Sequence, residues 1–580
     1  MTGIVPDVTG LRTHQPRPYE TYPCYPAVGG SVTTGWAAAV GTWPEGAAVL
    51  AVDGPVILDW DAVLEGLTAV FTDRAIAIDH LDMRDQVAPW AQTVKRTSSQ
   101  ALLDDPDFDK LGQGRLVDIF DSLPYRQPPA GGVLLVIGPG AGLVAHDVLW
   151  YADLPKRYAE NEVTSGRGRN LGQRPDDGDA TTKRLFYIDW PLLDRHRDTI
   201  GPAIDRFVDA QDAANPTSLD GDTLRRTLAD LVTQPFRTRP TFNTTSWGGH
   251  WAQRELGVNR EEPNTALGYE LIAPESGVLI GDLGSLVEVP FQLIVAHHPV
   301  DVLGEEVQAR FGNSFPIRFD YLDTVGGGNL SVHCHPQPDY MRDVFGWHYT
   351  QHESYYVMVG GPEAKIYLGL RDDIDLQDFH QEATLAEHHG VAFDIEQHVQ
   401  TFPAEPHQLY LVPAGTPHGS GEGNVILEVS ATPYLYSLRF YDWLRLDAQD
   451  NQRPVHVEHA FRNLATDRLG KRVADDLVRE PVTLREDDGW KEELLGGGGE
   501  LFFDIRRMVI ESDDPAPDDT AGRFHILNVV EGDGVLIETA TGRTHSLAYA
   551  ETIVLPAATG AYALRRVGSG RTRVVKSLVR

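Results

Sequence analysis

The first half of the chain alternates between continuous apolar runs and amphipathic stretches. The apolar runs at 48–52, 132–137 and 185–188 have the length and continuity of strands buried on both faces of a parallel sheet. The stretch 202–232 has helical spacing and is rich in Asp, Arg, Leu and Ala. This alternation predicts an α/β domain over residues 46–235, preceded by an N-terminal extension, 1–45.

Beyond about residue 240 the pattern changes to short β-rich runs separated by Gly and Pro, which predicts antiparallel barrels or sandwiches. A helical segment, 451–485, separates a first β unit, 240–450, from a second, 486–580. The fold class expected for the chain is therefore an α/β domain with a parallel sheet, followed by two β-rich units with a helical insertion.

Composition narrows the class of partner. A chain of 580 residues is too long for one hydrophobic core, in agreement with several domains. The formal charge of −34 argues against nucleic acid and anionic membranes, which need a concentrated positive surface. The chain has no apolar run of about 20 residues, no leader-like start and only two cysteines, Cys24 and Cys334. We therefore expect a cytoplasmic protein, whose oligomeric state the sequence leaves open.

Histidine and glutamate residues with metal-ligand spacing lie in the first β unit. His333 and His335 are two apart, so on a strand both imidazoles share one face. Glu353 lies in a strand-like run, and His418 follows the turn sequence VPAGTP. Three imidazoles and one carboxylate suit a single divalent ion such as Zn, Fe, Mn, Co or Ni, and an open coordination position is typical of catalytic sites.

The order and spacing of these four residues resemble those of the cupin family. The sequences WGGHWAQRELG, FPIRFDYLDTVGGGNLSVHCHP, AKIYLGL, VPAGTPHGSGEGNVILEVS and LRFYDWLRLD narrow the resemblance to successive blocks of class I mannose-6-phosphate isomerases, over residues 240–580. The resemblance implies a double cupin (jelly-roll) region, a zinc ion and the interconversion of mannose 6-phosphate and fructose 6-phosphate.

Two features of the resemblance concern the metal. The family holds zinc through Gln, His, Glu and His, whereas His333 occupies the Gln position here. An imidazole in place of an amide should tighten binding and widen the choice of metal towards Fe, Mn or Co. In the second β unit the corresponding turn reads LPAATGA, with Ala561 at the position of His418, so we expect that unit to hold no metal.

The resemblance also implies catalytic and substrate-binding residues. Arg439 matches an arginine that the family places at the active site. Gln351 stands where the family has a lysine, and His352, beside the ligand Glu353, is a candidate for moving the proton if a bulge turns it towards the metal. The family's acidic residue is replaced in this sequence near Pro433 and Tyr434.

A phosphate group needs cations to hold it, working against the acidic charge of the whole chain. The candidates are Lys365, Arg445, Arg342 and Arg371, each of which is individually a common kind of surface residue.

Three functions therefore remain open. The first is a metal-dependent sugar-phosphate isomerase, favoured by the ligand set, Arg439 and the FYDW sequence. The second is a cupin enzyme acting on a different carbohydrate, including oxidation through iron. The third is a sugar-phosphate-binding regulator without catalysis, and the missing lysine favours the second and third.

The N-terminal domain contains two sequences typical of nucleotide-binding loops. AVLAVDGPVILDW lacks the GK[ST] ending of a phosphate loop, and LLVIGPGAGL is GxGxG, not GxGxxG. With VLWYADLPKRYAE and RLFYIDWPLLDRHR, they distantly resemble a degenerate uridine-kinase-like P-loop domain. Such a domain has either a structural or regulatory role, or it binds a nucleotide. If it binds a nucleotide, the candidate cations for the phosphates are Lys156, Arg157, Lys183 and Arg184.

Overall fold

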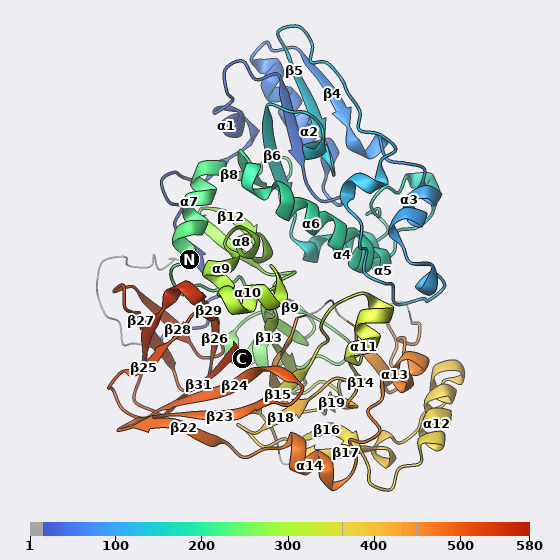
Figure 1. The fold of residues 1–580 in the computed structure, drawn as a ribbon, viewed down its shortest axis with the longest axis vertical. Helices are drawn as coiled ribbons and strands as arrows, with labels where there is room; N and C mark the ends of the chain where they lie inside the picture. Colours follow the sequence, from blue (N-terminus) through green and yellow to red (C-terminus); the bar gives the residue numbers. More distant parts are fainter. Residues whose placement is uncertain (1–15, 362, 433, 435, 448–449) are drawn as a thin grey trace.

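The computed structural model describes residues 16–361, 363–432, 434, 436–447 and 450–580. Figure 1 shows the α/β domain at the top, with two β-rich units side by side beneath it. The unit that ends the chain, in red, lies at the lower left, and the unit that contains His333 lies at the lower right. Pro433, where the sequence departs from the family's acidic residue, lies outside the described residues.

The N-terminal domain is built on a seven-stranded sheet in the order β2-β8-β7-β6-β3-β5-β4. Strands β3 to β7 are parallel, and β8 and β2 are added antiparallel at one edge. The central runs are buried because helices cover the sheet, which is why they are continuously apolar. The strands are β2 (Thr33–Thr34), β3 (Val49–Asp53), β4 (Ile78–Asp82), β5 (Val133–Ile137), β6 (Val148–Asp153), β7 (Arg206–Asp209) and β8 (Thr217–Asp220).

Helices join and cover these strands. They are α1 (Trp36–Val40), α2 (Trp60–Asp73), α3 (Trp90–Thr97), α4 (Lys156–Thr164), α5 (Thr182–Arg184), α6 (Trp190–Ile200) and α7 (Gly221–Leu231). Asp59 and Asp220 cap α2 and α7 by accepting hydrogen bonds from the first-turn backbone N–H groups of Ala62 and Thr223. The predicted parallel sheet is therefore present, with its helices.

Two of the predicted elements are wrong. Residues 185–188 form a π-helical turn, Leu185–Asp189, that continues α5 into α6, because a short apolar run does not distinguish a buried helix from a strand. The stretch 202–232 is not one helix: it starts within a short 3-10 turn, Gly201–Ala203, continues through β7 and β8, and is α-helical only in α7.

The first β unit is a sandwich of two antiparallel sheets, as predicted. One sheet has the order β18-β15-β20-β13-β10-β9 and the other β17-β16-β19-β14-β21. The strands of the first are β9 (Thr241–Asn243), β10 (Leu267–Leu271), β13 (Ile317–Asp323), β15 (Glu353–Val359), β18 (Leu409–Val412) and β20 (Val425–Ala431). Those of the second are β14 (Val332–Cys334), β16 (Lys365–Leu370), β17 (Val399–Pro403), β19 (His418–Ser420) and β21 (Leu438–Tyr441).

The second β unit also has two antiparallel sheets, in the orders β22-β23-β24-β31-β26-β29 and β25-β30-β27-β28. Its strands are β22 (Val482–Asp487), β23 (Trp490–Gly498), β24 (Leu501–Ile510), β25 (Ala516–Asp519), β26 (His525–Glu531), β27 (Gly534–Thr539), β28 (Thr544–Ala548), β29 (Thr552–Leu555), β30 (Ala561–Arg566) and β31 (Thr572–Val579). The predicted helical insertion is present as α13 (Val457–Asn463) and α14 (Lys471–Leu477).

The remaining elements connect the parts. A small sheet pairs β1 (Cys24–Tyr25) with β11 (Gly277–Asp282) and β12 (Ser285–Pro290). The other helices are α8 (Phe291–His297), α9 (Pro299–Leu303), α10 (Glu305–Phe311), α11 (Pro338–Tyr340) and α12 (Leu376–His389). Among the described residues, no helix is long and apolar enough to cross a membrane.

Candidate metal centre

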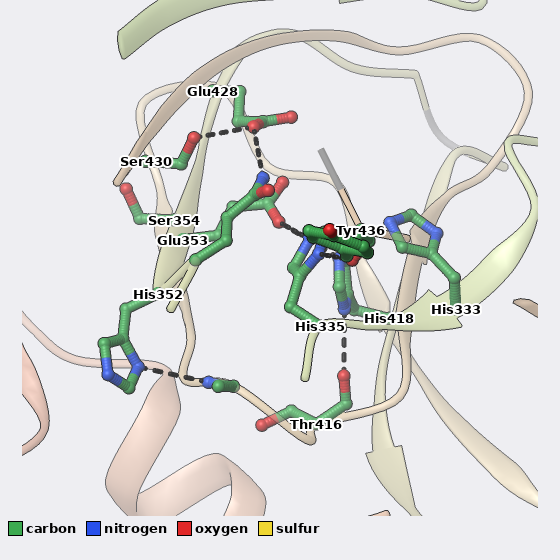
Figure 2. Close-up of polar contacts among 12 residues, drawn as sticks. His333, His335, His352, Glu353, Ser354, Thr416, His418, Glu428, Ser430 and Tyr436 are labelled. Atoms are coloured by element: carbon green, nitrogen blue, oxygen red, sulfur yellow. Dashed lines mark hydrogen bonds and ion pairs between the residues drawn. The ribbon is translucent and has the colours of Figure 1, made fainter. Parts of the chain in front are cut away.

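The structure brings His333, His335, Glu353 and His418 together. One possible ligand atom from each lies within 4.8 Å of the others, and all four side chains are buried (Figure 2). The histidines come from β14, the residue just after it and β19, whereas Glu353 begins β15 in the facing sheet. The cluster therefore lies between the two sheets of the sandwich.

Strand register explains the convergence. His333 on β14 is directly opposite His418 on β19, so their side chains share one face of the sheet. Their ring centroids are 4.3 Å apart. His335 is two residues beyond His333, and its ring lies 5.2 Å from that of His418.

A backbone carbonyl accepts a hydrogen bond from the Nδ1–H of each imidazole. The acceptors are Ser331 at 3.0 Å from His333, Thr416 at 2.9 Å from His418, and Tyr436 at 3.1 Å from His335. Nδ1 protonation leaves the Nε2 lone pairs of the neutral rings free. This is the pattern by which proteins orient metal-binding histidines.

The charge of the cluster also fits a cation. Glu353 Oε2 lies 2.7 Å from His335 Nε2 and 3.2 Å from His418 Nε2. Burial lowers the pKa values of His333 and His335, so charged imidazolium rings are disfavoured at neutral pH. His418 Nε2 is buried without a hydrogen bond among the described residues. A divalent ion would satisfy this nitrogen and balance the carboxylate, and the donor set suits zinc.

A second buried polar group, which sequence reasoning missed, lies on the Glu353 side of the sandwich. On adjacent strands, Arg318 is opposite Ser430, Asp320 is opposite Glu428, and Glu428 is opposite Tyr355. Directly opposite residues share a face, so these side chains line the same side of the sheet. The available signal was the pair of charges two residues apart in the apolar run FPIRFDYL.

The charged side chains of this group are in direct contact, so the charge of each affects the protonation of the others. The Arg318 guanidinium donates to Glu428 and, at 2.8 Å, to Ser430, and lies 3.3 Å from Asp320. Burial raises the pKa of Glu428 well above its usual range, although Arg318 opposes the shift. Burial likewise raises the pKa of Asp320 to about 6. These carboxyl groups can therefore hold a proton near neutral pH.

Gln351 and His352 occupy different environments. Gln351 is buried, its amide donates to Glu428 Oε1 at 3.3 Å, and its Oε1 has no hydrogen bond among the described residues. His352 points away from the three imidazoles, and its Nδ1 accepts a hydrogen bond from the Ala414 N–H at 3.2 Å (Figure 2). In this orientation His352 faces away from the four clustered residues, and its role in proton transfer stays a prediction.

Arg439 lies beside the cluster. It is directly opposite His333 in the pairing of β14 with β21, and its Nη1 donates to the Pro454 carbonyl at 2.9 Å. The nearby Asp442 pairs instead with Arg445 at 3.0 Å and Arg453 at 3.2 Å. Within the described part of the chain, Arg439 makes no ion pair with a carboxylate, although the charges of Asp442 and Asp107 act on it.

The predicted phosphate-holding cations are not gathered at the cluster. Lys365 is half-exposed and pairs with Glu396 at 2.8 Å. Arg445 is held by Asp442 and by the carbonyl of Asn329. Arg342 pairs with Asp339 and Asp343, and Arg371 with Asp373, all at exposed positions. These side chains have local partners because a surface cation in an acidic protein readily finds a carboxylate.

In the N-terminal domain, an internal carboxylate occupies the glycine loop. Asp53, at the end of β3, accepts hydrogen bonds from the N–H groups of Gly54 at 2.7 Å, Gly140 at 3.2 Å and Gly142 at 2.7 Å. Its Oδ2 also lies 2.7 Å from His196 Nε2. The donors that would cradle a phosphate in such a loop are therefore already engaged.

The cations predicted for a nucleotide are engaged as well. Lys156 pairs with Asp194 at 2.5 Å, Arg157 with Glu288 at 2.6 Å and Arg184 with Asp189 at 3.3 Å. Lys183 donates to the backbone carbonyls of Leu102 and Asp105.

Comparisons with known proteins find two kinds of match. Residues 35–233 match a protein family described as a domain of unknown function, DUF8485. A mannose-6-phosphate isomerase of Streptococcus mutans is 26% identical over 242 residues, which are 40% of this chain and 67% of that protein. A mannose-6-phosphate isomerase of Bacillus subtilis is 24% identical over 234 residues, 40% of this chain and 68% of that protein.

Among solved structures, a mannose 6-phosphate isomerase from Bacillus subtilis aligns with a TM-score of 0.49 and 20% identity, covering 59% of this chain and 99% of that one. The resemblance to mannose-6-phosphate isomerases predicted from sequence motifs is thus confirmed by curated relatives. The chain combines a region similar to mannose-6-phosphate isomerases with an N-terminal domain that matches a family of unknown function.

Proposed function

We propose that this protein is a metal-dependent sugar-phosphate isomerase that interconverts mannose 6-phosphate and fructose 6-phosphate. The observation that carries the proposal is the buried cluster of His333, His335, Glu353 and His418, whose three imidazoles present unprotonated Nε2 atoms beside one carboxylate. The curated relatives, which are named mannose-6-phosphate isomerases, supply the substrate. Zinc is the ion that we expect, with Fe, Mn or Co as substitutes.

The residues around the cluster suit this chemistry. A bound divalent ion would polarise the substrate oxygens during proton transfer between adjacent carbons. The buried Gln351 Oε1 can accept a hydrogen bond from a sugar hydroxyl, and the Arg439 guanidinium can hold negative charge. Glu428, whose pKa is raised by burial, can hold a proton at neutral pH and is the alternative to His352 for moving it.

Metal analysis followed by a coupled assay with mannose 6-phosphate tests the proposal. We expect about one zinc per chain, turnover that a chelator abolishes, and recovery on adding zinc back. Iron together with oxygen consumption would favour the alternative of an oxidising cupin. Binding of the sugar phosphate without turnover would favour a regulator. The replacement of the family's lysine by Gln351 is the feature that favours this outcome.

We further propose that the N-terminal domain is a P-loop-like unit that does not bind nucleotides. The Asp53 carboxylate at the glycine loop and the ion pairs of Lys156, Arg157 and Arg184 support this reading. Calorimetric titration of the full chain with magnesium and ATP, and then UTP, should give no binding heat. Saturable binding of either would contradict the proposal.

We place the reaction in the cytoplasm, without a nucleic acid or membrane partner. Both thiols, Cys24 and Cys334, are free, which suits a reducing compartment. The net charge of −34 disfavours polyanionic partners.

A further inference from the structure

His335 differs from the other two histidines in what holds it. His333 and His418 donate to the carbonyls of Ser331 and Thr416, each two residues earlier in the chain. His335 donates to the carbonyl of Tyr436, 101 residues away. The orientation of His335 therefore depends on how a distant segment is held in place (Figure 2).

The N-terminal domain holds that segment through the side chain of Tyr436. The phenol donates a hydrogen bond of 2.8 Å to the carbonyl of Asp109. Its ring stacks on Tyr187 with centroids 4.8 Å apart, and on Phe345 at 3.9 Å. Asp109 and Tyr187 lie in the stretch that matches the family of unknown function, and Tyr436 is 1% exposed.

The surrounding junction between the two parts is a packed interface. Phe108 is buried against the rings of Phe345, Tyr436 and His456. The backbone N–H of Leu111 donates to the carbonyl of Phe345 at 2.9 Å. The buried rings and the main-chain bond fix this segment of the N-terminal domain against Tyr436.

A polar contact extends the same junction. His459 Nε2 lies 2.7 Å from the Asp105 carboxylate. Its Nδ1 lies 2.7 Å from the hydroxyl of Tyr340. The N-terminal segment that begins at Asp105 is therefore held by directional contacts as well as by apolar packing.

We propose that Tyr436 is a positioning residue through which the N-terminal domain sets the orientation of the metal ligand His335. The inference rests on the proposed metal centre and gives the domain of unknown function a role there. Loss of the phenol or of Tyr187 would let the 436 carbonyl move, and the His335 imidazole would turn with it. Changes of this kind behind a ligand weaken metal affinity by about 10–100-fold.

Cobalt substitution of the full chain tests the proposal, because the visible absorption of Co²⁺ reports the geometry of its ligands. The variants are Tyr436→Phe, which removes only the hydroxyl, and Tyr187→Leu, which removes the stacked ring from the N-terminal domain. The matched control is Tyr321→Phe. Tyr321 is also buried and donates at 2.8 Å to a backbone carbonyl of another unit, that of Ala550, but it does not hold a ligand of the cluster.

We expect both test variants to bind Co²⁺ about 10-fold more weakly in competition with a chelator, and to shift its absorption bands. The control should lower the urea midpoint while leaving cobalt affinity and absorption unchanged. If Tyr436→Phe keeps the cobalt affinity and absorption of the wild type, Tyr436 has only a structural role and the inference is wrong. This outcome is decisive even if Tyr187→Leu does not fold. A wild-type chain that takes up no Co²⁺ would overturn the metal centre itself, and this inference with it.

Discussion

His297 and His545 also bury an Nε2 atom without a hydrogen bond among the described residues, but the His418 Nε2 lies 3.2 Å from the buried Glu353 carboxylate and beside two other imidazoles. A histidine in an ordinary core uses both ring nitrogens in hydrogen bonds, because an unsatisfied buried nitrogen costs free energy. Here the Nδ1 atoms have backbone acceptors, and the remaining nitrogens face one another and a carboxylate. This arrangement gives specific expectations for single substitutions.

The first expectation concerns removal of one ligand. His335→Ala should reduce bound metal from about one ion per chain to almost none. The chain should still fold, because the sandwich core does not depend on one imidazole, and it should unfold at the temperature of the metal-free wild type. The matched control is His352→Ala, a buried histidine that faces away from the cluster and whose loss should leave metal content unchanged. Full metal content in His335→Ala would contradict the assignment.

A second expectation concerns the buried charges beside the cluster. Arg318→Met leaves Glu428 and Asp320 buried without their cation, which should cost about 3–5 kcal/mol of unfolding free energy. Urea denaturation of the metal-free protein measures this cost. Adding Glu428→Gln to the same chain should recover part of it, and failure to do so would show that charge is not the cause.

The four clustered residues could be predicted because their sequence signals are local. The charged group of Arg318, Asp320 and Glu428 could not, because it forms only between distant strands. The shared face of His333 and His335 and the turn before His418 are local signals, and the order of the family-like motifs linked them to Glu353. Arg318 and Glu428 meet only through the register between β13 and β20, whose strands are 110 residues apart at this pair. Sequence could not show what holds Lys365 and Arg445, because Glu396 and the Asn329 carbonyl lie 31 and 116 residues away from them.

At the scale of elements, the turn between β18 and β19 positions His418. Gly415 in this turn has φ of +81°, and an added Cβ would lie 2.5 Å from both the Asn463 carbonyl oxygen and Gln337 Nε2. Gly415→Ala should therefore destabilise the fold by roughly 1–2 kcal/mol and displace His418, which would weaken metal binding.

Gly423→Ala is the control for this expectation. Gly423 has φ of +90°, but the nearest atom to a Cβ added there is the Cβ of Ala364, 3.7 Å away. This variant should carry a similar backbone cost, measured by urea unfolding, and keep the metal affinity of the wild type. Equal metal affinity in the two variants would show that the turn does not set the position of His418.

The predicted elements are present at 48–52, 132–137 and in the β-rich region after residue 240, and they are wrong at 185–188 and over 202–232. The short β-rich runs separated by Gly and Pro after residue 240 indicated antiparallel sheets, which the structure has. The four residues at 185–188 are apolar because they are buried in the interior of the α5–α6 helical stretch, and four residues carry no period that separates this from a strand.

At the scale of the whole molecule, we expect the junction between the N-terminal domain and the first β unit to respond to pH. Asp153, at the end of β6, is 6% exposed and lines a cavity shared with Pro274 and Glu275. Burial raises the pKa of Asp153 to about 7, with Arg197 opposing the shift. Between the ordinary pKa of 3.8 and about 7, the folded chain holds a proton that the unfolded chain releases.

The contribution of Asp153 to stability is therefore present at low pH and lost as the pH rises through about 7. In the wild type the free energy of unfolding should fall between pH 4 and pH 8. In Asp153→Asn this fall should be smaller, by up to roughly 4 kcal/mol. Urea denaturation at several pH values measures the difference from the wild type, with the exposed Asp176→Asn as control. Parallel curves for the wild type and Asp153→Asn would contradict the assignment.

The carboxylate of Asp53 within the glycine loop has a consequence for regulation. The backbone N–H groups of Gly140 and Gly142 already donate to the Asp53 carboxylate. These two donors are therefore not available to the phosphates of ATP. If the N-terminal domain binds no nucleotide, as proposed above, flux through the proposed isomerase should follow hexose phosphate supply and should not change with the ratio of ATP to ADP.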